Sequence, residues 1–364
     1  MCKDMLAAAG IQINGSRPWD IVVNNENFYK RVLIYGSLGL GESYMDGWWD
    51  CKKLDDFFYK VLDIGLQRKL GNKAFFVYLL QKISNLKNSN PFTIGKKHYD
   101  IGNDLFKNML DRRMVYSCAY WKDAKNLDEA QEAKLELACR KLGLKPGMKV
   151  LDIGCGWGSF LKYATEKYKV RAVGLTVSKE QLKFARGLCK NLDIEIRLQD
   201  YRDLNEKFDR IVSIGMFEHV GYKNYKTYMK VVHKSLNEDG LFLLQTIGKN
   251  NSWNYSDPDP WIVKYIFPGG MLPSIRRIGE SVEGLFVTED LHNFGADYDK
   301  TLLAWYNNFN KNWNKIKSNY NERFYRMWTY SLLSFAGAFR ARRIQLWQVV
   351  LSKNGAKGGY KSIR

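Results

Sequence analysis

The stretch Val150-Leu-Asp-Ile-Gly-Cys-Gly-Trp-Gly158 decides the fold class of this chain of 364 residues. Its apolar first half predicts a short buried strand, and its three alternating glycines predict a tight turn that leads into a helix. Such a turn places backbone amides and the N-terminus of a helix beside a ligand. The stretch therefore predicts a cofactor-binding turn, and a strand–helix turn without a ligand is the alternative.

The residues around the glycines narrow the choice of cofactor. A GxGxG turn by itself fits NAD, FAD or S-adenosylmethionine. The next predicted strand, residues 171–175, ends without the acid that holds the ribose of NAD, whereas Asp152 lies directly before the glycines. The dinucleotide fingerprint is incomplete, and the stretch resembles motif I of class I S-adenosylmethionine methyltransferases.

Strands and helices alternate around this turn. Apolar runs typical of buried strands lie at residues 149–153, 170–175, 194–198, 208–214 and 241–247. Helical spacing of apolar residues is found at 127–142, 160–168, 178–190 and 222–236, and Asn126 with Glu129 resembles a capping box. Because strands that alternate with helices form parallel sheets, the sequence predicts an α/β fold with a Rossmann-like, doubly wound sheet.

The first 90 residues show a different pattern. Helical spacing occurs at 28–34 and 54–66, and no Gly-rich cofactor loop is present in this part. The polar segment 82–91 is typical of a linker. We therefore predict a mainly helical N-terminal domain, residues 1–90, and a catalytic domain, residues 91–364.

Composition excludes several classes of protein. Apolar residues make up 45% of the chain and charged residues 26%, which excludes a largely disordered chain. The apolar runs, such as residues 75–80, are too short to span a membrane, and the first residues do not resemble a secretory signal, so we expect a cytoplasmic protein. Six cysteines without a CxxC pair and four histidines without ligand spacing predict free thiols and no metal.

Positive charge is concentrated at the C-terminal end. The net charge is +19, and residues 306–364 contain 12 Lys and Arg but one acid, Glu322. Such an excess fits a polyanionic partner, either nucleic acid or an anionic lipid surface. Aromatic residues among these charges fit a membrane interface or stacking on single-stranded nucleic acid. A solvated basic face above ordinary core aromatics is the alternative.

Further motifs run in order along the chain. They are residues 18–20 (PWD), 44–49 (YMDGWW), 98–104 (HYDIGND), 116–121 (YSCAYW), 174–181 (GLTVSKEQ), 215–221 (GMFEHVG), 265–270 (YIFPGG), 272–274 (LPS), 292–298 (HNFGADY) and 337–342 (GAFRAR). Together with the Gly turn, they resemble the family of cyclopropane-fatty-acyl-phospholipid synthases and mycolic acid cyclopropane synthases. The first two motifs resemble the N-terminal domain of bacterial members that act on phospholipids.

The resemblance implies a site for S-adenosylmethionine. In this site Gln181 hydrogen-bonds the ribose hydroxyls in place of the missing acid, and Asp200 accepts from the adenine amino group. Relatives often have Trp-Glu where this chain has Tyr201 and Arg202. The cofactor-binding residues expected from the resemblance are Tyr116, Ser117, Asp152, Gly154, Cys155, Gly156, Thr176, Gln181, Asp200, Tyr201 and Arg202.

The resemblance also implies the reaction. A cis double bond attacks the sulfonium methyl group, and the resulting carbocation loses a proton to a bound bicarbonate as the cyclopropane ring closes. A base of this kind neither traps the cation nor becomes alkylated. The residues that would hold it are Cys118, Glu218, Gln245, Ile247 and Tyr298.

Two positions depart from the family pattern. Gln245 stands where many relatives have a His; its amide donates a hydrogen bond but carries no proton or positive charge. We therefore expect retained activity with a flatter pH response. Phe335 stands where bacterial members often have a Cys, so no thiol acts at that position.

These observations predict an enzyme that forms cyclopropane rings in unsaturated acyl chains of membrane phospholipids. The resemblance further implies lipid docking or dimerisation by the N-terminal domain, a homodimer, and peripheral association with the inner face of the membrane. Three alternatives stay open: simple methyl transfer to an acyl chain or small amine, a nucleic-acid-binding protein or nucleic-acid methyltransferase, and a lipid-binding protein without activity. The charge alone motivates the second, and no Asn-Pro-Pro-Tyr or Pro-Cys motif supports it, so we expect no nucleic-acid partner.

Overall fold

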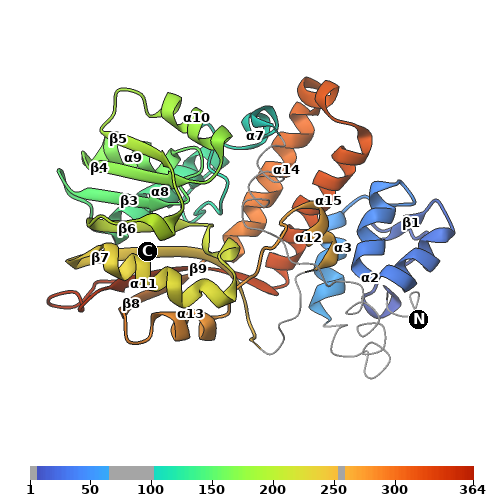
Figure 1. The fold of residues 1–364 in the computed structure, drawn as a ribbon. Coiled ribbons are helices and arrows are strands. Elements are labelled where there is room, and N and C mark those ends of the chain that lie inside the picture. The colour runs from blue at the N-terminus through green and yellow to red at the C-terminus, as the bar shows by residue number, and fades with distance from the viewer. Residues whose placement is uncertain (1–5, 65–101, 253–258) are drawn as a thin grey trace. The chain divides into compact units, whose positions relative to one another are not determined.

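The computed structural model describes residues 6–64, 102–252 and 259–364 (Figure 1). These residues form two compact units. In the first unit the described residues are 6–64, 259–268 and 302–344, and in the second they are 102–252, 269–301 and 345–364. The units therefore do not follow a single cut in the sequence. The segment that predicts a linker, 82–91, lies outside the described residues, and the division into domains 1–90 and 91–364 stays a prediction.

The second unit is built on a sheet of seven strands in the order β5-β4-β3-β6-β7-β9-β8. The first five strands of this order, from β5 through β4, β3 and β6 to β7, pair in parallel, as predicted. Strands β8 and β9 form an antiparallel pair that was not predicted from the sequence. The bounds are β3 Lys149–Ile153, β4 Arg171–Thr176, β5 Ile194–Leu198, β6 Phe208–Ile214, β7 Leu236–Lys249, β8 Val287–Asn293 and β9 Ile344–Ser352.

Helices cover both faces of this sheet. Consecutive strand residues point to opposite faces, so Val150 packs in one hydrophobic cluster with α8, α9 and α10, while Leu151 packs in the other with α11 and α13. The bounds are α7 Asn103–Met109, α8 Leu127–Lys141, α9 Ser159–Tyr168, α10 Lys179–Leu188, α11 Tyr225–Ser235 and α13 Ile275–Val282. Three-ten helices are η1 Tyr201–Asp203, η2 Phe217–His219, η3 Tyr222–Asn224 and η4 Lys317–Asn319.

The predicted helix start at Asn126 is confirmed. The Asn126 side chain accepts a hydrogen bond from the Glu129 amide at 3.0 Å, and the Glu129 carboxylate accepts from the Lys125 amide at 2.9 Å. These bonds satisfy amide groups that a helix N-terminus leaves without a partner. They fix the point at which α8 begins.

The first unit is mainly helical. Its α2 (Asn27–Met45) is kinked at Gly36, which has φ 57° and ψ −130°. Strands β1 (Ile21–Val23) and β2 (Trp49–Cys51) form a small antiparallel pair. The other helices are α3 Leu54–Asp63, α12 Pro260–Tyr265, α15 Glu322–Arg340 and the part of α14 (Ala296–Ile316) from residue 302 onward.

The basic C-terminal region makes internal ion pairs. Within the first unit, Arg326 binds Asp50 at 2.8 Å and Arg340 binds Asp55 at 2.7 Å. Several of the aromatic side chains that could have formed an exposed interface are buried, namely Trp328, Tyr330, Phe339 and Trp347. For these rings the membrane-interface interpretation is wrong and the core interpretation is correct, because buried rings are not exposed to a bilayer surface.

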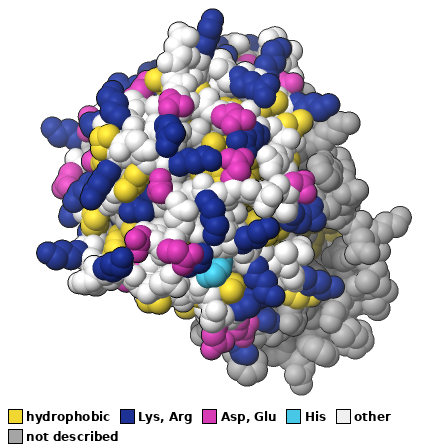
Figure 2. Space-filling view, turned by 60° about the vertical axis from the view of Figure 1, so that its left-hand side comes forward, with side chains coloured by type: hydrophobic (Ala, Val, Ile, Leu, Met, Phe, Trp, Pro, Cys, Tyr) yellow, Lys and Arg dark blue, Asp and Glu magenta, His cyan; other side chains and the backbone are white. Residues whose placement is uncertain are grey.

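Charged side chains of both signs share the surface of the molecule. Figure 2 shows Lys and Arg spread over one face with Asp and Glu among them. No helix within residues 6–64, 102–252 and 259–364 is long and apolar enough to cross a bilayer. In the same part of the chain, no group of three His, Cys, Asp or Glu is arranged to hold a metal ion. The five described cysteines, Cys51, Cys118, Cys139, Cys155 and Cys189, are free thiols.

Candidate functional site

The Gly turn joins β3 to α9 in the geometry expected from the sequence. Gly154, Gly156 and Gly158 have φ of 85°, 55° and 86°, a region that favours glycine. A Cβ on Gly154 would lie 2.8 Å from Met216, whereas a Cβ on Gly156 would meet nothing within 4 Å. The amides of Gly154 and Cys155 donate to the Leu175 carbonyl, so these two amides are already bonded within the protein, whereas the sequence predicted amides that face a ligand. Open space therefore lies over Gly156.

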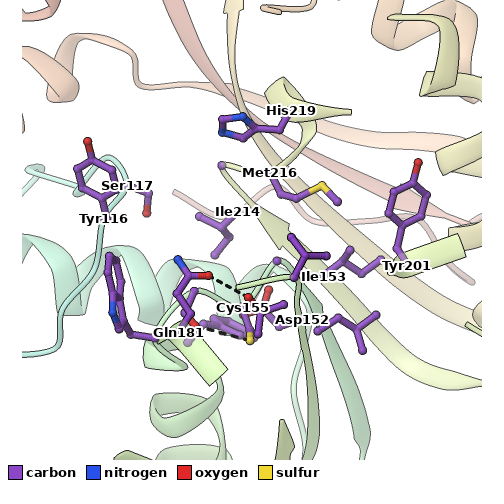
Figure 3. A pocket seen from close by; sticks show the side chains of 18 of the residues that line it. Tyr116, Ser117, Asp152, Ile153, Cys155, Gln181, Tyr201, Ile214, Met216 and His219 are labelled. Atoms are coloured by element: carbon purple, nitrogen blue, oxygen red, sulfur yellow. Dashed lines mark hydrogen bonds between the residues drawn. The ribbon is translucent and has the colours of Figure 1, made fainter. Parts of the chain in front are cut away.

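A cavity of about 260 Å³ lies beside this turn. Because β3, β4 and β6 are adjacent and parallel, their carboxyl ends meet at one edge of the sheet, and ligands of such sheets bind at this edge. Figure 3 shows Tyr116, Gln181 and Tyr201 reaching the cavity from separate segments. All eleven predicted cofactor-binding residues line it: Tyr116, Ser117, Asp152, Gly154, Cys155, Gly156, Thr176, Gln181, Asp200, Tyr201 and Arg202.

Hydrogen bonds orient two of the side chains that are predicted to bind the cofactor. The Thr176 hydroxyl donates to Gln181 Oε1 at 2.9 Å, which orients the Gln181 amide. Arg202 donates to the Asp200 carboxylate through Nε at 2.9 Å and Nη2 at 2.7 Å. The hydrogen bond from Arg202 holds the pKa of Asp200 below its ordinary value. Asp200 therefore stays ionised, and the Arg202 guanidinium is already bound to it.

Two buried charged groups line the same cavity. Asp152 is buried and its Oδ1 has no hydrogen-bond partner; burial raises its pKa to about 7. Lys134 of α8 is 1% exposed and donates from Nζ to the Ser117 hydroxyl at 3.0 Å. Lys134 is not among the residues predicted from the sequence. The available signal was its place on the apolar face of α8, where it follows Leu127 by seven residues and Ala130 by four.

Glu218 and Ile247 are in direct contact. Glu218 lies in η2 directly after β6 and is 6% exposed. Its Oε1 accepts a hydrogen bond from the Ile247 amide at 2.6 Å, while its Oε2 is buried without a partner. Burial raises the pKa of Glu218 to about 7, although the Ile247 amide favours the ionised form. Glu218 is therefore a buried carboxyl group that changes charge near neutral pH.

Gln245 lies two residues before Ile247 on β7. Its backbone carbonyl accepts from the Gly215 amide at 2.9 Å, which holds it beside the end of β6. Its side-chain Oε1 accepts from Gln348 Nε2 at 2.9 Å, and its own Nε2 is buried without a partner. Gln348 of β9 is fully buried. Gln348 is not among the residues predicted from the sequence, because no motif marks it and the pairing of β9 brings it to Gln245.

Cys118 and Tyr298 belong to two segments that are bonded together. Cys118 is fully buried, and burial raises the pKa of its thiol well above the ordinary value. The next amide, of Ala119, donates to the Thr301 hydroxyl at 3.2 Å, and Thr301 lies one turn after the buried Tyr298 on α14. None of the five predicted catalytic residues lines the cavity, although Ser117 and His219, next to Cys118 and Glu218, do.

Comparison with known proteins identifies the family. A family model described as mycolic acid cyclopropane synthetase matches residues 84–349. The chain belongs to this family. The match spans the Gly turn and all five predicted catalytic residues.

Members of the family resemble the chain over long alignments. Cyclopropane-fatty-acyl-phospholipid synthase of Escherichia coli (strain K12) is 57% identical over 368 residues, which cover 100% of this chain and 95% of that protein. The structure of the cyclopropane synthase MmaA2 from Mycobacterium tuberculosis is 34% identical, with a TM-score of 0.68 over 74% of this chain and 100% of that chain. Mycolic acid cyclopropane synthase CmaA1 complexed with SAH and CTAB is 36% identical, with a TM-score of 0.67 over 74% of this chain and 99% of that chain.

These comparisons confirm two predictions. The structural neighbours confirm the α/β fold of a class I S-adenosylmethionine methyltransferase. Membership of the family confirms that the chain is an enzyme of the cyclopropane synthase class. The roles of the individual site residues stay predictions.

Proposed function

We propose that this member of the cyclopropane synthase family transfers a methylene group from S-adenosylmethionine to the cis double bond of unsaturated acyl chains in membrane phospholipids. The observation that carries the proposal is the cavity at the carboxyl ends of β3, β4 and β6, lined by all eleven predicted cofactor-binding residues. The full-length similarity to the E. coli phospholipid synthase supports the lipid substrate.

The cavity fits S-adenosylmethionine. Space over Gly156 allows a ligand to approach the backbone, and Gln181 is oriented by Thr176. The unpaired Asp152 oxygen suits a positively charged group. When bound, S-adenosylmethionine supplies a strongly electrophilic sulfonium methyl group. The chain's own residues hold and orient the donor, and Tyr116 and Ser117 line the cavity with it.

Ring closure needs a base, and two buried polar atoms without partners support the proposal that this base is bicarbonate. Glu218 Oε2 and Gln245 Nε2 are buried polar atoms without partners near the ends of the adjacent strands β6 and β7. A carboxylate accepts a hydrogen bond and an amide donates one, so the two complement the O–H and the oxygens of bicarbonate. Alkene attack on a methyl group produces a carbocation, and a bicarbonate held here would receive the methyl proton. Cys118, Ile247 and Tyr298 complete the proposed base site.

Lipid mass analysis tests the reaction. We expect purified chain, S-adenosylmethionine and vesicles of unsaturated phospholipid to give acyl chains heavier by one methylene that have lost the double bond. Glu218→Gln should lower the rate by about 10²-fold, because it cannot take part in proton transfer or orient a base through charge. The exposed Glu283→Gln is the control. A heavier product that keeps its double bond would indicate simple methyl transfer, and binding without product would indicate a lipid-binding protein.

The base is tested separately. We expect activity to fall in buffers depleted of bicarbonate and to return when bicarbonate is added. Gln245 supplies no titrating imidazole, so the pH response near pH 6.5 should be flatter than in Gln245→His, and the change that remains near pH 7 is that of Glu218. A profile of the unmodified chain that equals the profile of Gln245→His would contradict this assignment of Gln245.

We further propose that the chain is a homodimer that binds peripherally to the cytoplasmic face of the membrane. The net charge of +19 supports attraction to anionic headgroups, and the proposed substrate lies in a bilayer. Light scattering of the purified chain should give the mass of two copies. A mass of one copy would contradict the dimer and leave the proposed reaction unaffected.

A further inference from the structure

Two lysines are buried on the same side of α8, and among the residues that the structure describes only one of them has an acidic partner at contact distance. Lys134 and Lys141 are seven residues apart, which is two helical turns, and both are at most 1% exposed. Lys141 forms an ion pair with Asp290 at 3.3 Å. For Lys134 the hydrogen bond that the described residues supply is to the neutral Ser117 hydroxyl, at 3.0 Å. The charge of Lys134 is therefore not neutralised by a contact like that of Lys141.

A buried ammonium group without an ion pair is costly for the fold. Burial lowers the pKa of Lys134 to about 8, even though Asp111, Cys118 and Asp152 nearby favour its charged form. Lys134 also lines the cavity. A positively charged group that lies in the wall of a cavity, although its burial destabilises the fold, is a candidate for binding an anion.

The same wall of the cavity holds a carboxyl group that can still accept a hydrogen bond. Asp152 lies at the end of β3, lines the cavity, and has a buried Oδ1 without a partner. Its Oδ1 and the Lys134 ammonium thus offer the cavity one acceptor and one donor of opposite charge. The proposed donor molecule carries a matching pair at its amino-acid end, a carboxylate and an ammonium group.

We propose that Lys134 binds the carboxylate of the amino-acid end of S-adenosylmethionine, in the same wall in which Asp152 is available to its ammonium group. This inference rests on the proposed function. Lys134 thereby sets specificity for a donor with an intact amino acid, while the Ser117 hydroxyl holds the Lys134 side chain in position. The competing explanation is a structural lysine that only supports the Ser117 segment.

Calorimetric binding of two ligands separates these explanations. S-adenosylhomocysteine has the amino-acid end, and 5′-deoxy-5′-methylthioadenosine lacks it but keeps the nucleoside and sulfur. We expect Lys134→Met to weaken binding of S-adenosylhomocysteine by about 10- to 100-fold, the range for a hydrogen bond to a charged group. Binding of methylthioadenosine should change less than about twofold. Equal losses for both ligands, or no loss for either, would overturn the proposal.

A change in the ligand tests the same contact without any change in the protein. In the unmodified chain, the methyl ester of S-adenosylhomocysteine should bind about 10- to 100-fold more weakly than the free acid, because the ester has lost the negative charge. Equal affinity for ester and acid would overturn the proposal.

Two control variants complete the design. In Lys134→Met, the ester and the acid should bind alike, whereas Lys141→Met should keep the unmodified ratio because Lys141 is paired with Asp290. A Lys141→Met variant that loses the ratio while Lys134→Met keeps it would also contradict the assignment. If the unmodified chain binds neither S-adenosylhomocysteine nor methylthioadenosine, the proposed function fails.

Discussion

Burial shifts the pKa values of three ionisable side chains in the second unit. Burial raises the pKa of Asp152 and of Glu218 to about 7 and lowers the pKa of Lys134 to about 8. The cause is the same in each, because a low-dielectric interior favours the neutral form. All three groups therefore change charge close to neutral pH, in or next to the cavity.

Glu218 should make stability depend on pH. Its folded pKa of about 7 lies above the ordinary value of 4.5, so its contribution is full below about pH 4.5 and is lost as the pH rises through 7. Glu218→Gln cannot ionise and avoids this loss. Relative to the unmodified chain, the variant should gain about 2 kcal/mol in free energy of unfolding between pH 5 and pH 8. Urea unfolding at both pH values measures the difference, and a pH-independent difference would refute the shift.

The Gln245–Gln348 pair should act as a unit in stability. Gln348→Leu leaves Gln245 Oε1 buried without its donor, which should cost about 1–3 kcal/mol in free energy of unfolding. Replacing both residues by Leu removes both polar groups and should recover most of that loss. A double-mutant cycle by urea unfolding measures the coupling. Additive losses would show that the hydrogen bond contributes nothing.

At the level of elements, close helix packing in the first unit depends on one glycine. A Cβ on Gly337 of α15 would lie 2.6 Å from the Asp55 carbonyl and 2.8 Å from the Tyr59 amide of α3. Backbone atoms cannot move aside as flexible side chains do. The two helices approach closely because position 337 lacks a side chain.

Substitution of this glycine should separate α15 from α3. Gly337→Ala should cost about 1–3 kcal/mol in free energy of unfolding, the range for overpacking. Gly279→Ala in α13 is the matched control, because its Cβ meets nothing within 4 Å and a helical Ala stabilises by up to about 1 kcal/mol. Thermal or urea unfolding compares the two, and the same sign for both variants would contradict the packing argument.

For the whole molecule, the sum of charges is more informative than any single basic residue. Ion pairs such as Arg326 with Asp50 and Lys353 with Glu238 use part of the C-terminal basic residues internally. The net charge of +19 is unchanged by such pairs. Long-range attraction to a polyanionic surface depends on this sum and is screened by salt.

Vesicle binding should therefore be sensitive to salt. We expect the chain to bind anionic phospholipid vesicles more tightly than zwitterionic ones, with a loss of about tenfold or more when salt rises from about 0.05 M to about 0.5 M, as the screening length shortens. Vesicle sedimentation measures it, with an oligonucleotide of equal charge as the competitor. Preference for the oligonucleotide would favour the nucleic-acid alternative over the lipid surface.

Local patterns in the sequence were sufficient for β3 to β7 and for the cofactor cavity, but they did not predict β8 and β9. The predicted strands at 194–198 and 208–214 coincide with β5 and β6, because apolar residues alternate with Glu195 and Arg197 in β5 and surround the buried centre of β6. The Gly turn and the residues after β4 and β5 line one cavity, as predicted, because parallel strands bring their carboxyl ends to one edge of the sheet. Both results depend on interactions close in sequence or on one general rule of sheet topology.

The tertiary structure decided what depends on distant segments. Pairing of β9 brings Gln348 to Gln245, 103 residues away, and a hydrogen bond joins the segment of Cys118 to Thr301 on α14. Residues 302–344 belong to the first unit although they lie between β8 and β9 of the sheet in sequence. Periodicity records which face of an element is buried, but it does not record what that face contacts. The unpaired charge of Lys134 became visible only when folding showed which buried side chains had partners and which did not.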